Sequence, residues 1–112
     1  MSLFSNSSKR TNGEQKDKDL QPLTLRMGAN FSLSKTAEIL PEYEFDIISP
    51  KEDYHEIYAR KEYFEFTISF IEDFGKTHVS VLCYSDTKPF QIKKQLKSFM
   101  IFLKEKLSDY LV

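Results

Sequence analysis

Apolar and polar residues alternate with a period of two through the middle of the chain, which is the pattern of half-buried β-strands. We expect strands over residues 43–47, 54–60, 63–71 and 77–84, all enriched in β-branched and aromatic residues. The third places four large apolar residues on one face: Phe64, Phe66, Ile68 and Phe70. The short links between the strands predict antiparallel pairing.

The period becomes helical after the last strand, from Lys88 to about Tyr110. Ser85, Asp86 and Thr87 have side chains that can cap a helix N-terminus, and Pro89 lies where a first helical turn tolerates proline. One apolar stripe follows the helix at spacings of three and four residues: Ile92, Leu96, Phe99, Leu103, Leu107 and Tyr110. We expect this stripe to cover the phenylalanine-rich face of the third strand.

Residues 23–40 are open to two interpretations. The first five alternate as in a short edge strand, and Gly28 begins a sequence typical of a turn. A short helix capped by Ser32 or Ser34 follows in one interpretation, and Pro41 ends it. In the other, the strand simply continues beyond the turn.

The first 21 residues have almost no apolar content. Such a segment cannot bury enough surface to offset its ordering entropy, so we expect residues 1–21 to be a disordered polar tail. Residues 22–112 are then a single domain. The predicted fold class is α+β: an antiparallel four- to five-stranded meander sheet, covered on one face by a long C-terminal amphipathic helix.

The composition excludes several classes of protein. The 112 residues include 16 Lys plus Arg and 17 Asp plus Glu, a net charge of −1, which excludes a uniformly basic nucleic-acid coat. No stretch approaches the roughly 18 apolar residues of a membrane span. The N-terminus lacks the apolar middle region of a signal peptide, and the single Cys cannot form an internal disulfide. We therefore expect a cytoplasmic protein without a membrane partner.

No set of residues for catalysis or metal binding is evident. Strand alternation places His78 and Cys83 on opposite faces, and no Cys or His residues have the spacing of metal ligands. Glu42, Glu44 and Asp46 share one face of a predicted strand, as solvent-facing residues commonly do. Three glycines cannot build a phosphate-binding loop. We expect no enzyme activity, no catalytic residue, no metal and no small-molecule cofactor.

Charge is distributed unevenly along the chain. Residues 1–41 carry six basic and four acidic groups, residues 42–86 four and eleven, and residues 87–112 six and two. Several lysines lie toward the N-terminal half of the predicted helix, where the helix dipole disfavours cations. The candidate anion-binding residues are Lys93, Lys94, Lys97 and Lys104. The alternative is a solvated lysine face that aids solubility.

A second candidate surface is the outer face of the sheet, if the helix covers only the other face. The candidate partner-binding residues there are Tyr63, Ile71, Leu82 and Tyr84. Ile101, on the far side of the helix, is the fifth. The apolar run over residues 99–103 makes the helix apolar nearly all round, so either another part of the fold or a partner covers Ile101 and Phe102.

The expected function is therefore a small non-catalytic binding or regulatory module. It docks a protein partner, or forms a homodimer, through the outer sheet face or the C-terminal helix. The alternative is a domain that binds single-stranded nucleic acid with the basic helix face. This alternative ranks second because residues 42–86, which hold most of the sheet, have a net charge of −7 and would repel phosphates. A third, lower interpretation is an acidic sheet that imitates nucleic acid.

Overall fold

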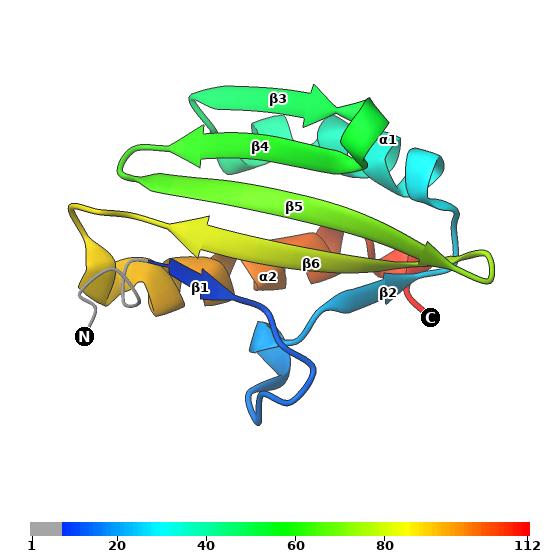
Figure 1. Cartoon of the computed structure of the whole chain (residues 1–112), viewed down its shortest axis with the longest axis horizontal. Helices are drawn as coiled ribbons and strands as arrows, with labels where there is room; N and C mark the ends of the chain where they lie inside the picture. Colours follow the sequence, from blue (N-terminus) through cyan, green and yellow to red (C-terminus); the bar gives the residue numbers. More distant parts are fainter. Residues whose placement is uncertain (1–7) are drawn as a thin grey trace.

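An antiparallel sheet forms the centre of the protein, as a computed structural model describes for residues 8–112 (Figure 1). Four strands follow one another as a meander: β3 (Ile47–Lys51), β4 (Glu56–Lys61), β5 (Phe64–Asp73) and β6 (Lys76–Tyr84). Two short strands, β1 (Ser8–Arg10) and β2 (Leu23–Leu25), pair with the free side of β6. The predicted α+β class is confirmed, with six strands in place of four or five.

Alternating burial along β5 and β6 follows the period-two pattern of the sequence. Phe66 lies opposite Cys83, and Ile68 lies opposite Val81, and all four side chains are fully buried. The residues between them point to the other face of the sheet, because side chains alternate along a strand. The predicted inner face of these two strands is confirmed.

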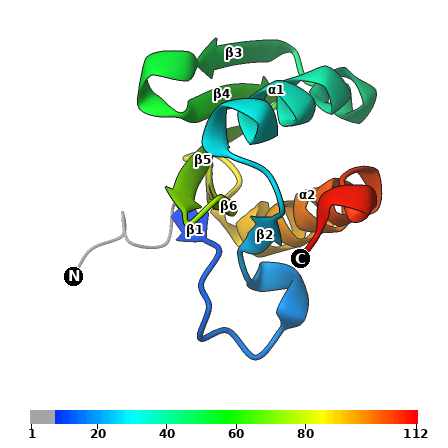
Figure 2. The same ribbon diagram turned by 90° about the vertical axis from the view of Figure 1, so that its right-hand side faces the viewer.

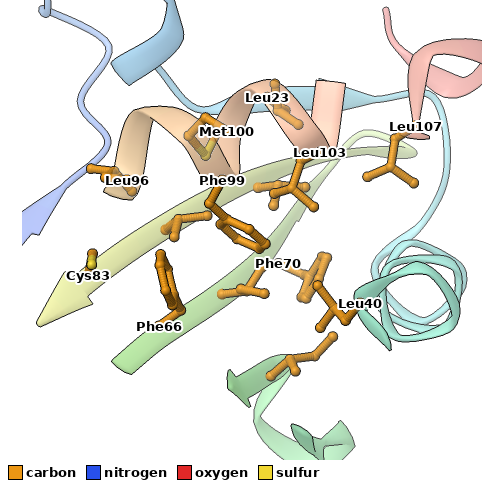
Figure 3. Packing of buried hydrophobic residues seen from close by; sticks show 14 of the residues in the cluster. Leu23, Leu40, Phe66, Phe70, Cys83, Leu96, Phe99, Met100, Leu103 and Leu107 are labelled. Atoms are coloured by element: carbon orange, nitrogen blue, oxygen red, sulfur yellow. The ribbon is translucent and has the colours of Figure 1, made fainter. Parts of the chain in front are cut away.

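Two helices, not one, cover the inner face of the sheet (Figure 2). Helix α1 (Ala29–Ile39) contacts β3, β4 and β5, while α2 (Ile92–Lys106) contacts β1 and β6. Residues 23–40 are thus a strand followed by a helix. The apolar stripe of α2 is buried from Ile92 to Leu107, and the ring of Phe99 lies 4.9 Å from that of Phe66 between helix and sheet (Figure 3).

The sheet, rather than a serine, caps helix α1. The backbone N–H of Ala29 donates to Oε1 of Glu72 on β5 at 2.7 Å. A Cβ at Gly28 would lie 3.0 Å from the same oxygen, so glycine leaves room for the carboxylate. The helix therefore begins before Ser32, where sequence alone suggested a cap. An acidic group at this position also complements the helix dipole.

The strand predicted over residues 43–47 is wrong. The chain forms the 3-10 helix η3 (Leu40–Tyr43) and turns at Glu44, whose φ of 61° is left-handed. Strand β3 begins only at Ile47, so Glu42, Glu44 and Asp46 do not share a strand face. The alternation arises because Tyr43 and Phe45 pack on α2, with ring centroids 5.2 and 5.6 Å from Phe99. In the same way, Tyr54 belongs to the 3-10 helix η4 (Glu52–Tyr54), not to a strand.

Residues 8–21 are ordered, which differs from the expectation of a disordered polar tail through residue 21. After β1, the chain leaves the sheet, forms the 3-10 helix η2 (Lys18–Leu20) and returns as β2. We name residues 11–22 the excursion. Its one large apolar side chain, Leu20, is fully buried in the core. Thr11 holds the start of the excursion, because its N–H donates to the Val81 carbonyl at 2.9 Å. Residues 1–7 of the predicted tail lie outside the described residues.

Candidate functional site

The outer face of the sheet is open. Both helices lie on the inner face, and no helix of the described chain crosses the other side (Figures 1 and 2). Strand pairing aligns two rows of outward side chains across the sheet. The first row is Ser8, Tyr84, Glu65, Arg60 and Ile47, and the second is Arg10, Leu82, Thr67, Tyr58 and Ser49. Leu82 and Tyr84 are thus neighbouring apolar side chains on this face, and polar and charged residues surround them.

Three of the four candidate residues on this face come together. Leu82 and Tyr84 are successive outward residues of β6, and Tyr84 is 38% exposed. Tyr63 is 55% exposed in the β4–β5 turn, two residues before Glu65, which pairs with Tyr84. Ile71 lies apart, beside His78 toward the other end of the sheet. We name Tyr63, Leu82 and Tyr84 the outer patch.

Polar residues separate Ile71 from the outer patch. Ser69 and Ser80 form the pair that lies between them on β5 and β6. Nearer to the patch, the Tyr58 hydroxyl donates to Oε1 of Glu65 at 2.9 Å. Partial burial and this hydrogen bond raise the pKa of Tyr58. The face therefore has a local apolar contact at one end and not a continuous apolar surface.

Helix α2 leaves little apolar surface outside the core. Phe102 is half-buried, and its ring lies 4.9 Å from that of Tyr43, which comes from η3. Tyr43 also donates from its hydroxyl to Ser98 Oγ at 3.0 Å, and its burial raises its pKa. Ile101 remains 41% exposed. The fold therefore covers Phe102 itself, and within α2 as described Ile101 is the large apolar side chain that stays exposed.

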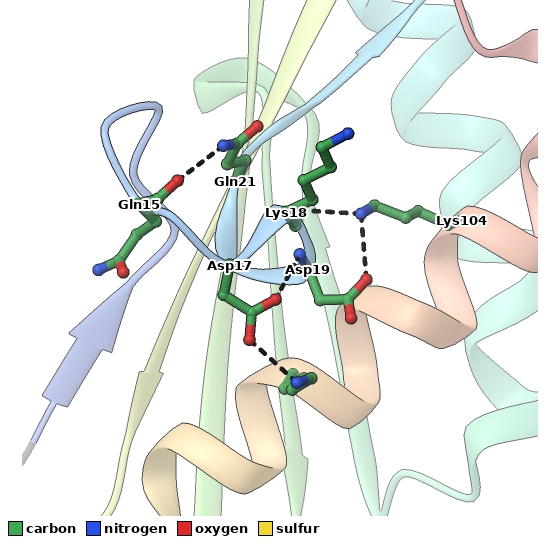
Figure 4. Close-up of polar contacts among 7 residues, drawn as sticks. Gln15, Asp17, Lys18, Asp19, Gln21 and Lys104 are labelled. Atoms are coloured by element: carbon green, nitrogen blue, oxygen red, sulfur yellow. Dashed lines mark hydrogen bonds and ion pairs between the residues drawn. The ribbon is translucent and has the colours of Figure 1, made fainter.

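The lysine face of α2 already has anionic partners within the chain. Lys97 Nζ lies 2.9 Å from Asp17 Oδ2, and Lys104 Nζ lies 3.3 Å from Asp19 Oδ1 (Figure 4). Lys104 also donates to the carbonyl of Lys18 at 2.9 Å. The excursion thus lies on two of the four candidate anion-binding residues. These contacts within the chain account for the lysines on that side of the helix, so an external anion is not needed to explain them.

The ion pairs shift the titration of their members. Hydrogen bonding to Lys97 lowers the pKa of Asp17, and the same bond raises the pKa of Lys97. Lys106 pairs with Glu42 at 2.7 Å, and this contact raises the pKa of Lys106. These side chains are partly exposed to solvent, so each pair contributes modestly and depends on salt.

Lys93 and Lys94, the other two candidates, are exposed near the start of α2. Neither lies within ion-pair distance of an acidic group among residues 8–112. They lie close in sequence to Phe90, which is 100% exposed. Lys88 Nζ lies 5.2 Å from the centroid of the Tyr63 ring, which brings the β6–α2 connection to the β4–β5 turn. This contact brings Lys88, which precedes α2, to one end of the outer face.

The acidic residues of the strand region are mostly not on the outer face. Glu52 and Asp53 lie in η4, Glu62 lies in the β4–β5 turn, and Glu72 caps α1. The two rows described above contain one acidic and two basic residues. The net charge of −7 over residues 42–86 is therefore distributed mainly over turns, because the strands themselves use few acids.

The potential reactive groups are poorly placed for chemistry. Cys83 is fully buried, and desolvation raises the pKa of its thiol to about 12. His78 Nδ1 lies 3.1 Å from Thr24 Oγ1, and His78 Nε2 lies 3.9 Å from Asp73 Oδ2. This Asp–His–Thr set stands on the open sheet face, where nothing excludes water from a reacting group.

Sites for metals or small molecules are also scarce in the described part of the chain. Residues 8–112 contain no group of three or more His, Cys, Asp or Glu side chains that could hold a metal ion. A wide, open hollow of about 450 Å³ lies along the β3–β4 turn, lined by Pro50 to Tyr54. No helix among these residues is both long enough and apolar enough to cross a membrane.

Sequence reasoning missed two features of these surfaces. The spacing of Asp17 and Asp19 before an isolated leucine, Leu20, was the available signal for a segment that docks on lysines. Phe90, directly after Pro89, interrupts the apolar stripe of the helix, and such a residue falls outside the core.

Comparisons with protein-family models, curated proteins and solved structures gave no match, so the surfaces described above are the observations that bear on function.

Proposed function

We propose that this protein is a non-catalytic binding module that docks a protein partner on the outer patch. The observation that carries the proposal is the placement of both helices on one face of the sheet. The opposite face leaves Tyr84 exposed beside the half-buried Leu82, and tyrosine is enriched among the anchors of protein interfaces. The buried thiol and the exposed His78 support the non-catalytic part.

The edges of the sheet favour docking through the face. Strand β3 is short and ends in Pro50 and Lys51, and proline and lysine are residues that discourage strand addition. On the other edge, β1 and β2 are three residues each and are interrupted by the excursion. A partner strand would therefore find few consecutive hydrogen-bonding groups on either edge.

The charges around the outer patch favour a protein over a nucleic acid. Arg10 lies beside Leu82, while Glu65 lies beside Tyr84 with Arg60 as its next neighbour. A face that carries both signs can present an acidic group to a basic group of a second copy related by a two-fold axis. A second copy of this chain is thus the first partner to test.

Light scattering coupled to size-exclusion chromatography, over a range of protein concentrations, tests this partner. We expect a concentration-dependent dimer that Leu82→Glu abolishes. Ile71→Glu is the matched control, because Ile71 is exposed on the same face but lies outside the patch. A monomer at every concentration, or equal loss with both variants, contradicts self-association through the patch.

Affinity capture from nuclease-treated lysate with wild type and Leu82→Glu then tests a different protein partner. We expect a protein that the wild type retains and the variant does not. Equal capture by both chains contradicts docking on the patch. Nucleic-acid binding by α2 is less well supported, because Lys97 and Lys104 have partners in the excursion.

A further inference from the structure

The connection between β6 and α2 contains a phenylalanine whose side chain is not buried in the fold. Phe90, in the 3-10 helix η5 (Pro89–Gln91), has its whole side chain in solvent at 100% exposure. By contrast, Ile92, the next apolar residue two positions later, is buried in the core. Because this ring stays in water, folding gains no hydrophobic free energy from it. This surface meets the outer patch at Tyr63, but the inference does not rest on the proposed function.

Lysines flank Phe90 in the sequence. Lys93 and Lys94 follow Phe90 by three and four residues, which places them on the same side of a helical turn. Lys88 precedes it by two residues, and its Nζ lies over the Tyr63 ring at 5.2 Å, a cation–π contact. We name Tyr63, Lys88, Phe90, Lys93 and Lys94 the basic corner.

The three lysines of the basic corner are not neutralised by ion pairs. Among residues 8–112, none of them lies within 4.0 Å of a carboxylate oxygen, whereas Lys97, Lys104 and Lys106 each do. The acidic residues nearest in sequence are Glu62, Glu65 and Asp86, and none of them forms an ion pair with these lysines. Residues 1–7 contain no acidic side chain and join the described chain at Ser8, which pairs with Tyr84 at this end of the sheet.

We propose that the basic corner is a peripheral binding site for an anionic lipid surface. Phe90 enters the boundary between headgroups and acyl chains, and the lysines lie among the anionic headgroups. Such binding needs no membrane-spanning segment. It is reversible, because one aromatic ring and three lysines are much weaker than two lipid anchors.

The shape of the corner favours a membrane over a nucleic-acid strand. A fully exposed ring protrudes without a wall beside it, and a flat bilayer can receive a protruding group. A single strand instead follows a basic groove and stacks successive bases on aromatic rings. Here Lys88 occupies one face of Tyr63, so this ring offers a single face on which a base could stack.

Co-sedimentation of the full chain with vesicles tests the proposal. We expect binding to vesicles of phosphatidylcholine that contain a minority of phosphatidylserine, little binding to pure phosphatidylcholine, and release at high salt. Each lysine changed to glutamine at positions 88, 93 or 94 should weaken binding about fivefold, the equivalent of ~1 kcal/mol. Phe90→Ser should weaken it about tenfold, since the apolar ring no longer enters the bilayer.

The chain provides a matched control for each change. Phe74, at the tip of the β5–β6 hairpin, is 98% exposed but stands beside Glu72 and Asp73, so Phe74→Ser should leave vesicle binding unchanged. Lys51→Gln, in the edge strand β3, serves the same purpose for the lysines. Circular dichroism of each variant separates a loss of binding from a loss of folding.

Several results would overturn the proposal. One is equal binding to neutral and anionic vesicles, and another is an equal effect of Phe90→Ser and Phe74→Ser. A third is binding of the wild type to a single-stranded oligonucleotide that displaces it from vesicles, because the corner would then be a nucleic-acid site. Failure of any of these tests leaves the dimer experiment on the outer patch unaffected, since Leu82 is not part of the corner.

Discussion

Lys97 Nζ lies 2.9 Å from Asp17 Oδ2 and joins helix α2 to a residue 80 positions earlier in the chain. The contact is a hydrogen-bonded ion pair, and a second pair, Lys104 with Asp19, lies on the same side of the helix. Together they hold the excursion against α2. Lys97 and Lys104, two of the four helix lysines considered as a site for an external anion, thus bind acidic groups of the same chain.

We expect Asp17→Asn to make the stability of the protein less dependent on pH on the acid side. The pKa of Asp17 is below its usual 3.8, so its contribution is complete above that pH and is lost as the pH falls through the lowered value. The pKa of Lys97 is above 10.5, so the same pair is lost again as the pH rises through the raised value. Urea unfolding of wild type and variant, from neutral to acid pH, measures the difference.

Glu14→Gln is the control for the Asp17 experiment, because Glu14 is exposed in the same excursion and its side chain has no ion pair among the described residues. The stability difference between wild type and Asp17→Asn should shrink both on acidification and with added salt. A difference that stays constant with pH would contradict the ion pair.

Leu20→Ala should destabilise the protein by about 2–5 kcal/mol, as truncation of a fully buried leucine does. Leu20 is 0% exposed and belongs to the same core cluster as Leu96 and Leu103 of α2. Chemical denaturation monitored by circular dichroism gives the value. Lys16→Ala, exposed in the same excursion, should change stability little. If both substitutions had equally small effects, the excursion would not be part of the folded core.

Glu72→Ala should cost about 1 kcal/mol, because the first N–H groups of α1 lose their acceptor and the helix dipole loses a nearby negative charge. The contact at issue is the 2.7 Å hydrogen bond from the Ala29 N–H. Thermal unfolding measures the effect, and Glu105→Ala on the exposed side of α2 is the control. Equal melting temperatures for wild type and Glu72→Ala would show that the cap does not stabilise the helix.

Cys83 should react with thiol reagents only when the protein unfolds. Its pKa is raised from 9.0 to about 12 in the folded protein, so its thiolate fraction near neutral pH is about a thousandfold lower than in the unfolded chain. We expect the modification rate to rise steeply across the urea unfolding transition. Rapid modification of the native protein would mean that the inner face at Cys83 opens far below the unfolding midpoint.

Strong periodicity made much of the fold predictable. In β5, β6 and α2 the apolar residues serve one buried face, so the pattern in the sequence directly reports the geometry of each element. Tyr43 and Phe45 show where this fails: they alternate as in a strand but pack on Phe99 from a 3-10 helix and its following turn. The alternation correctly indicates that both rings are partly buried. The backbone conformation that buries them depends on tertiary contacts, which the local pattern does not report.

The candidate surfaces were predictable only in part, for a similar reason. Exposure of Tyr63 and Tyr84 follows from strand alternation, which is local. The neutralisation of Lys97 and Lys104 depends on a segment distant in sequence, and no local pattern reports such a contact. The start of α1 was missed because its acceptor, Glu72, comes from the sheet and not from the residues before the helix.

The split edge strand has a consequence for how the chain assembles. β1 and β2 are made before the other strands described here, yet the strand with which both pair is β6, which is made after the whole β3–β5 region. The meander of β3 to β6 can form from contacts close in sequence, whereas the N-terminal edge must close a long loop to reach its place. We therefore expect the segment from β1 to β2, although it is synthesised before the meander, to dock after it, once α2, against which the excursion lies, is in position.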